Sequence, residues 1–200
     1  MIIEGVLTTR NPDGTPNVAP MGPILTGDWS QLLFRPFPSS VTYGNLKRTR
    51  CGVFHVTDDV LLIARYALSL PAPLPDMRPA EHVAGEILTD ACRWYEVEVV
   101  GVDESRERPE ITCRVVSMGR QRDFWGFNRA KHAVLEATIL ATRLHLLARP
   151  EIDRELARLA TIVEKTAGPE EREAFDLVRG FVAQQMTVPR ETGSADRPGA

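Results

Sequence analysis

The sequence predicts a mainly β protein with added helices, in which an antiparallel β region is followed by a helical C-terminal region. Short segments of β-branched or alternating apolar residues, separated by turn residues, occupy most of residues 1–124. From Asn128 to Gln185 the apolar residues instead recur at helical spacing. We therefore expect a β domain over residues 1–124 and a helical region over residues 125–186. Residues 187–200 are polar and contain proline and glycine, so we expect a disordered tail there.

The N-terminal residues predict a β-hairpin. The run from Ile2 to Thr9 is rich in β-branched residues and ends at the turn residues Asn-Pro-Asp-Gly, 11–14. The returning strand, residues 16–25, is interrupted by two prolines and Gly22. Because proline cannot donate to a strand ladder, we expect this strand at a sheet edge or with a bulge. A glycine there would let another backbone or a flat ligand approach closely.

The next stretch predicts a strand, a tight loop and a short helix. The apolar strand Leu32 to Phe34 leads to Arg35, at a corner that two prolines stiffen. Ser39 or Ser40 then occupies the N-cap position of a helix that runs to about Arg48.

This corner has the properties of an anion site. The first turn of a helix exposes unpaired N–H groups and carries a positive partial charge. Arg35 adds donors that suit a phosphate, and Ser39, Ser40 and Thr42 add hydroxyl groups. Two interpretations stay open: a phosphate-binding corner, or an N-capped helix beside an ordinary surface arginine.

The middle of the chain predicts another strand and helix. Gly52 to Thr57 alternates as a strand, and Asp58 or Asp59 can cap a helix from Val60 to about Leu68. The two acids can also be proposed as acid/base catalysts. The proline-rich run Ser69 to Pro79 predicts a long loop, such as a lid or a dimer-facing segment.

Two long strands and three helices complete the prediction. The strands run from Ile87 to Val102 and from Ile111 to Gln121. Arg120 and Arg122 at the end of the second strand either bind an acidic ligand or are solvated. The first helix ends at Pro150, and the others cover about 151–167 and 170–186 because Gly168-Pro169 separates them.

Composition excludes several classes of function. The net charge of −3 and the pI near 5.9 lack the basic excess of a general nucleic-acid binder. No apolar run is long enough to span a membrane, and the N-terminus lacks the features of a signal peptide. The widely spaced Cys51, Cys92 and Cys113 predict reduced, partly buried thiols in a cytoplasmic protein.

Motifs of nucleophilic hydrolases, P-loop proteins and Rossmann dinucleotide-binding proteins do not occur in the sequence. The histidines His55, His82, His132 and His145 lack the spacing of a metal-binding helix, and no cysteine joins them at zinc-finger spacing. We therefore expect no metal site.

A set of short motifs, taken in order, is more specific than any one of them. The motifs are Ile3–Thr9, Asn17–Pro23, Phe34–Phe37, Thr42–Leu46, Gly52–Asp59, Phe127–Glu136 and Thr142–Leu144. Together they closely resemble a largely uncharacterised family of FMN-binding split-barrel proteins, which is similar in fold to flavin reductases and pyridoxamine-phosphate oxidases. The resemblance covers roughly residues 2–185.

The resemblance implies a six-stranded antiparallel split barrel plus C-terminal helices, in a homodimer with FMN at or near the subunit interface. The FMN phosphate would lie at Arg35–Asn45, and the backbone of Ala19–Pro23 would lie along the flavin ring, where the N–H of Gly22 would meet flavin N5 or O4. The implied cofactor-binding residues are Met21, Gly22, Pro23, Arg35, Pro36, Phe37, Ser39, Ser40, Thr42, Asn45, Asn128 and Lys131, with Arg129 as a further neighbour.

The function implied by this resemblance is that of a flavin-dependent oxidoreductase, which passes electrons from a nicotinamide or another donor to a small-molecule acceptor. Because the flavin carries the chemistry, the protein needs no conspicuous acid/base pair. One alternative is an FMN-binding or redox-sensing module without turnover. Another is a split barrel with a related cofactor, a deazaflavin or haem, for which His55 or His132 would be the iron ligand to examine.

Overall fold

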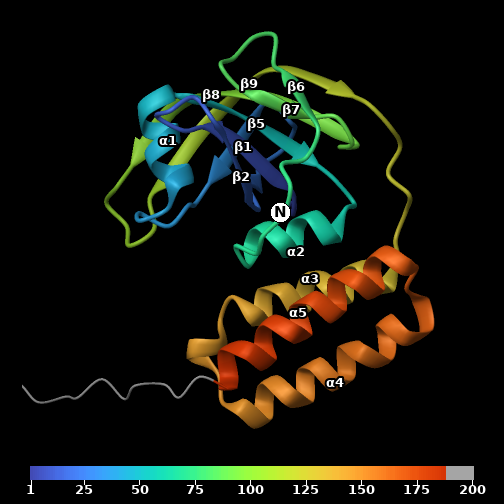
Figure 1. The fold of residues 1–200 in the computed structure, drawn as a ribbon. Coiled ribbons are helices and arrows are strands. Elements are labelled where there is room, and N and C mark those ends of the chain that lie inside the picture. The colour runs from blue at the N-terminus through green and yellow to red at the C-terminus, as the bar shows by residue number, and fades with distance from the viewer. Residues whose placement is uncertain (188–200) are drawn as a thin grey trace, which may run out of the picture.

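The computed structural model describes residues 1–187, so the predicted tail lies outside the described residues except for Thr187. A curled antiparallel sheet lies beside a cluster of helices (Figure 1), which confirms the predicted split barrel with C-terminal helices. The strands are β1 (Val6–Arg10), β2 (Pro16–Pro20), β3 (Ile24–Leu25), β4 (Gln31–Phe34), β5 (Cys51–Val56), β6 (Met77–Pro79), β7 (Glu86–Leu88), β8 (Arg93–Asp103) and β9 (Glu110–Arg120). The helices are α1 (Val41–Thr49), α2 (Val60–Ala67), α3 (Arg129–Ala141), the 3₁₀ turn η1 (Leu144–Leu146), α4 (Arg149–Thr166) and α5 (Pro169–Thr187).

The two ends of the main sheet are connected through the segment that follows its first hairpin. Its strand order is β2-β1-β5-β8-β9-β4-β3. After β2 the chain keeps pairing with the N-terminal segment: the Met21 N–H donates to the Gly5 carbonyl at 2.9 Å, and the Ile3 N–H donates to the Pro23 carbonyl at 3.2 Å. The strand β3 therefore touches both β4 and the segment before β1, which brings the two ends of the sheet together.

The predicted hairpin and its interrupted second arm are confirmed, with β2 at a sheet edge. The expected number of strands was wrong, since the sheet has seven strands and not six. The physical reason is that Pro20 and Pro23 lack the N–H donors of a ladder, so the returning arm divides into β2 and β3.

Alternating side chains separate the inside of the barrel from its outside. Leu7, Phe54 and Tyr95 are buried in the barrel core, and Phe54 lies opposite Tyr95 on the neighbouring strand. Thr8 and Glu96 occur at the intervening positions and point outward, yet they are also buried. A second layer must therefore cover this outer face.

That layer is the small sheet of β6 and β7 with its connecting loop. The Thr8 hydroxyl donates to the carbonyl of Glu86 at 2.5 Å. The Glu96 carboxylate accepts hydrogen bonds from three successive backbone N–H groups, those of Glu81, His82 and Val83, at 3.3, 2.6 and 3.1 Å. A buried carboxylate thus holds the loop against the barrel.

The prediction of one continuous strand over residues 87–102 was wrong. Residues 86–88 form β7, and a turn separates them from β8, which begins at Arg93. The two strands belong to different sheets, so the chain has to change direction at residues 89–92. The predicted loop over residues 69–79 is confirmed up to residue 76, after which β6 pairs with β7.

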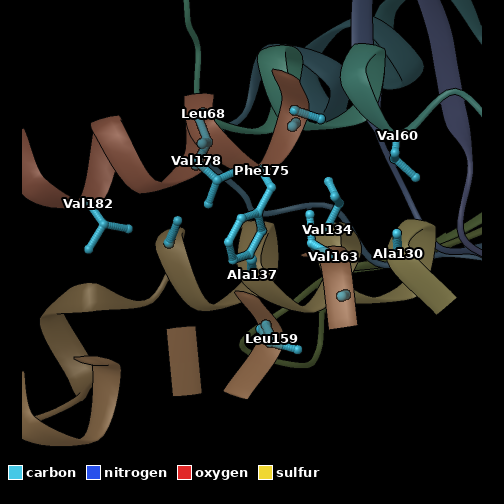
Figure 2. Close-up of a cluster of buried hydrophobic side chains, with 14 of the residues drawn as sticks. Val60, Leu68, Ala130, Val134, Ala137, Leu159, Val163, Phe175, Val178 and Val182 are labelled. Atoms are coloured by element: carbon cyan, nitrogen blue, oxygen red, sulfur yellow. The ribbon is translucent and has the colours of Figure 1, made fainter. Parts of the chain in front are cut away.

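The helices pack around a second apolar core that includes α2 as well as α3, α4 and α5. Figure 2 shows Val60 of α2 and Leu68, which directly follows α2, in one cluster with Val134 of α3 and Phe175 of α5. On another side of α2, Ile63 belongs to a cluster with Val6 of the barrel. Because α2 contributes to both clusters, it connects the barrel to the helices.

The first C-terminal helix is shorter than predicted, because α3 ends at Ala141 rather than near Pro150. The Thr142 hydroxyl donates to the Ile139 carbonyl at 2.8 Å, which satisfies one acceptor of the last turn, and Leu144 then becomes buried in η1. Pro150 lies in the first turn of α4, where its missing N–H costs nothing. None of the helices within residues 1–187 has the length and apolar character of a membrane span.

Candidate functional site

The predicted phosphate-binding corner forms at the start of α1. Ser40 is the N-cap: its hydroxyl accepts from the Tyr43 backbone N–H at 3.2 Å and donates to the Phe37 carbonyl at 2.7 Å. Ser39 precedes the cap and is exposed, whereas Pro36 is buried. The corner thus presents an exposed hydroxyl beside the unpaired N–H groups of a first helical turn.

Two guanidinium groups approach a single carboxylate at this corner, and a third lies beside them. Arg35 is about half exposed, and its Nη2 lies 3.0 Å from Oε1 of Glu110. Arg106 approaches the same carboxylate at 3.7 Å. Arg108 donates to the Arg35 carbonyl, and its guanidinium lies 4.3 Å from the centre of the exposed Phe37 ring. The excess positive charge and the free donors of these arginines suit a phosphate dianion.

Two predicted phosphate ligands lie on the opposite, buried face of α1. The Thr42 hydroxyl accepts from Asn17 Nδ2 at 3.1 Å. Asn45 Nδ2 donates to the Thr9 hydroxyl at 3.1 Å and to Asn11 Oδ1 at 2.9 Å. Both side chains therefore hydrogen-bond α1 to the first hairpin, which is a structural role.

The segment predicted to lie along the flavin ring connects β2 with β3. Met21 packs against the barrel core. A Cβ at Gly22 would lie 2.8 Å from Ile2 Cγ2 and 3.1 Å from Glu4 Oε2, so a larger residue would force these two side chains to shift. Partial burial, followed by the nearby carboxylate of Glu136 on α3, raises the pKa of Glu4. Sequence reasoning missed this carboxyl group beside the proposed ring segment.

The remaining two predicted residues lie at the junction of barrel and helices. Asn128 caps α3, because its Oδ1 accepts from the N–H groups of Ala130 and Lys131 at 2.8 and 3.1 Å. Lys131 Nζ donates to the Asp58 carbonyl at 2.6 Å and pairs with the Glu171 carboxylate at 3.1 Å. Both side chains hold the helical region in place.

A cavity of about 680 Å³ opens beside them. Carboxylates outnumber cationic groups around it, so its charge does not suit a phosphate. Its charged lining residues are Asp58, Asp59, Asp90, Arg122, Lys131, Glu170 and Glu171.

The predicted site residues therefore do not all lie together. Figure 1 shows α1 at the left of the barrel, whereas α3 begins at its right, below the segment that leaves β9. Within one chain, Asn128 and Lys131 do not join the corner at Arg35.

The paired acids Asp58 and Asp59 have different tasks. Asp59 caps α2 by accepting from the Leu62 N–H at 2.8 Å, which confirms the capping interpretation. Asp58 is buried, with Arg122 Nη2 at 2.6 Å and the Trp125 N–H at 3.0 Å. Burial alone would raise the pKa of Asp58, but the hydrogen bonds from Arg122 and Trp125 outweigh it and hold the pKa below its ordinary value.

His55 is not available to bind the iron of a haem. Its ring is fully buried, with Nδ1 at 3.2 Å from the Val6 carbonyl and Nε2 accepting from the Leu88 N–H at 3.0 Å. Both nitrogens are thus occupied, and burial lowers the pKa of His55 to about 4. The haem hypothesis for His55 was wrong. His132 is exposed, with its ring centre 6.1 Å from that of Phe127.

Solved structures with a similar fold include proteins described as FMN-bound, as FMN-binding or as a flavin reductase. An FMN-bound protein from Methanosarcina mazei superposes with a TM-score of 0.77 at 24% identity, covering 90% of this chain and 94% of that chain. An FMN-binding protein from Thermus thermophilus, with bound p-hydroxybenzaldehyde, gives 0.51 at 19% identity over 62% and 75% of the two chains. The styrene monooxygenase flavin reductase from Pseudomonas putida S12 gives 0.51 at 13% identity over 60% and 82%.

No curated protein matches the sequence. Two family models do match it, and both carry the description "protein of unknown function (DUF447)". The model of the N-terminal domain covers residues 3–122, and the C-terminal model covers residues 128–180. Nearly the whole described chain is thus accounted for, and the protein belongs to the DUF447 family.

Proposed function

We propose that this protein binds FMN non-covalently and acts as a flavin-dependent oxidoreductase. The observation that carries the proposal is the likeness, over 90% of the chain, to an FMN-bound protein of the same family. The corner at Arg35 supports it independently, since it offers positive charge and exposed donors to a phosphate dianion.

The hydrogen bonds of the described residues favour some of the candidate groups as ligands of the FMN phosphate. Arg35, Ser39 and the α1 N–H groups that precede Tyr43 are available to it. The Tyr43 N–H already donates to Ser40, and the side chains of Thr42 and Asn45 are engaged with the hairpin. Arg35 would exchange part of its contact with Glu110 for the phosphate. The flavin, when bound, supplies the hydride and electron chemistry. The chain's own residues would bind the phosphate, orient the ring and limit the access of water.

We further propose that the protein is a homodimer. The segment between β9 and α3 exposes three aromatic side chains, Phe124, Trp125 and Phe127, at 48%, 84% and 94%. Asp58 accepts from the Trp125 N–H in the middle of this segment, and the α3 helix that Asn128 caps follows it, so the backbone that carries the rings is anchored. An exposed apolar patch of this kind is typical of protein interfaces.

The dimer is tested by sedimentation velocity at micromolar concentration. The unmodified protein should sediment as a dimer of the 22.3 kDa chain, and the double variant Trp125→Ser/Phe127→Ser should sediment more slowly. An unmodified protein that stays monomeric would contradict the proposal.

The phosphate assignment is tested by titrating FMN and riboflavin into the protein and into Arg35→Ala. Hydrogen bonds to charged groups contribute about 1.5–3 kcal/mol, so the variant should bind FMN about ten- to a hundredfold more weakly. Riboflavin lacks the phosphate and should be nearly indifferent to the change. The control is Arg114→Ala, which removes another exposed arginine, one that pairs with Glu98 on the barrel wall. If Arg35→Ala weakens the binding of FMN and riboflavin equally, Arg35 acts on the fold or contacts the flavin ring and does not bind the phosphate.

Turnover is tested separately. Anaerobic addition of a reduced nicotinamide should bleach the absorption of bound flavin, and a small acceptor should restore it at a useful rate. If the bound flavin is never reduced, the protein would instead be a flavin carrier or sensor without turnover.

A further inference from the structure

The open end of the barrel contains a cavity that none of the proposed flavin contacts uses. Its volume is about 520 Å³, and Trp29, Arg93, Tyr95, Val115 and Met118 line it. Tyr95 is a core residue of the barrel, and Val115 packs against the same core. The ladder of β8 and β9 continues beyond a bulge at Glu96, so that Tyr95 lies opposite Met118. The cavity is therefore the mouth of the barrel.

An aromatic pair forms one wall of this mouth. The Trp29 ring stacks on Tyr95, with ring centres 4.3 Å apart and planes 9° from parallel. The turn that carries Trp29 is fixed on both sides: the Ser30 N–H donates to Asp28 Oδ1 at 2.9 Å, and the Ser30 carbonyl accepts from the Val115 N–H at 2.9 Å. The wall is thus flat, apolar and held in position.

A guanidinium group without a carboxylate partner stands at the rim. Arg93 is exposed, and no carboxylate within residues 1–187 lies within salt-bridge distance of it. Its cross-strand neighbour Arg120 pairs with Asp123 at 2.6 Å. Arg93 itself lines the cavity, beside Tyr95, so its charge lies at the mouth. The one carboxylate at the rim, Asp28, is already engaged by Ser30.

We propose that the barrel mouth binds a small planar aromatic carboxylic acid, with its ring against Trp29 and Met118 and its carboxylate on Arg93. Ligand sites favour the mouths of β-barrels and have volumes of about 300–1,000 Å³, with mostly apolar walls and a few polar groups. Met118 is exposed and flexible enough to adapt to a ring. A free guanidinium is the natural partner of a carboxylate.

This mouth is separate from the phosphate corner. Ser30 precedes β4 and Arg35 follows it, so the two sites lie at opposite ends of that strand. At about 3.4 Å per residue, the five-residue step corresponds to roughly 17 Å. The proposal therefore stands whether or not the corner binds FMN.

The test is calorimetric titration of 2-naphthoate into the protein, once saturated with FMN and once without FMN. We expect binding in both states, and binding about ten- to a hundredfold weaker for Arg93→Gln. The neutral analogue 2-naphthylmethanol should bind weakly and be indifferent to that variant. Arg114→Gln, a change at another exposed arginine of the same sheet, should bind 2-naphthoate like the unmodified protein. Met118→Glu, which adds a negative charge at the mouth, should abolish binding.

Three results would overturn the proposal. The first is that 2-naphthoate does not bind at all. The second is that the acid and the alcohol bind equally well, or that Arg93→Gln and Arg114→Gln behave alike. The third is release of FMN in proportion to bound 2-naphthoate, because the mouth would then belong to the flavin site. A protein that takes up 2-naphthoate but no FMN would instead contradict only the proposed function.

Discussion

The Asp58 carboxylate lies 2.6 Å from the Arg122 guanidinium, and this pair joins the end of β5 to the end of β9. The other oxygen of Asp58 accepts from the Trp125 N–H at 3.0 Å, and the Asp58 carbonyl accepts from Lys131. One residue thus fixes the chain where it passes from the barrel into α3. The exposed rings of the aromatic segment depend on this anchor for their position.

Replacing Asp58 should therefore lower the free energy of unfolding. In Asp58→Asn the partly exposed Arg122 guanidinium loses one charged partner and keeps Asp90, so the variant should lose about 1.5–3 kcal/mol of stability. Urea unfolding measures the loss of stability. Asp90→Asn is the matched control, because Asp90 contacts the same guanidinium at 3.0 Å from an exposed position. It should cost less than about 1 kcal/mol. Equal losses in the two variants would contradict the assignment of Asp58 as the anchor.

His55 should make the protein less stable in mild acid. Burial lowers the pKa of His55 from 6.5 to about 4, so the folded state excludes a proton that the unfolded state binds. The stability that the neutral, buried His55 provides is fully present above about pH 6.5, and it is lost as the pH falls toward 4. The slope should be about 1.4 kcal/mol per pH unit, on the order of 3 kcal/mol in total. Urea unfolding across this range measures it, and an NMR resonance of His55 that titrates near neutral pH would contradict it.

Glu4 should have the opposite effect. Its pKa is raised above the ordinary 4.5, so the folded state retains a proton that the unfolded state releases. Stability is then greater at low pH and declines as the pH rises through the raised pKa. Glu4→Gln should therefore raise the melting temperature near neutral pH, and this gain should vanish in acid. Glu136→Gln removes only the neighbouring charge and should give a smaller gain. A Glu4→Gln variant that melts lower at neutral pH would show that its charge stabilises the fold.

Local signals explain which features could be predicted from the sequence. The turn residues 11–14, the helix caps Ser40 and Asp59, and the break at Gly168-Pro169 each act within a few residues of themselves. Their physical effect does not depend on the rest of the fold. The phosphate corner follows from the same logic, because an N-terminal turn and an adjacent arginine are contiguous in sequence.

Features that depend on distant contacts could not be predicted. Asp58 and Arg122 are separated by 64 positions, and no spacing rule connects them. Glu96 alternates along β8 as a polar outward residue, and only the loop folded over it makes it buried. Thr42 and Asn45 resemble ligands by residue type, but their helix face is set by packing on the hairpin. The parts of the candidate site that are formed by neighbouring residues could therefore be predicted, and the parts formed by residues distant in sequence were missed.

The two serines at the start of α1 give a direct test of stability against binding. Ser40 is the N-cap, with the Tyr43 N–H at 3.2 Å, so Ser40→Ala should cost about 1 kcal/mol of stability. Ser39 is exposed and makes no cap contact, so Ser39→Ala should leave the urea midpoint unchanged. If Ser39 donates to the FMN phosphate, its loss should weaken FMN binding about tenfold and leave riboflavin binding unchanged. Each variant is the control for the other, since they differ by one position and remove the same hydroxyl. An FMN affinity that is unaffected by Ser39→Ala would remove Ser39 from the phosphate site.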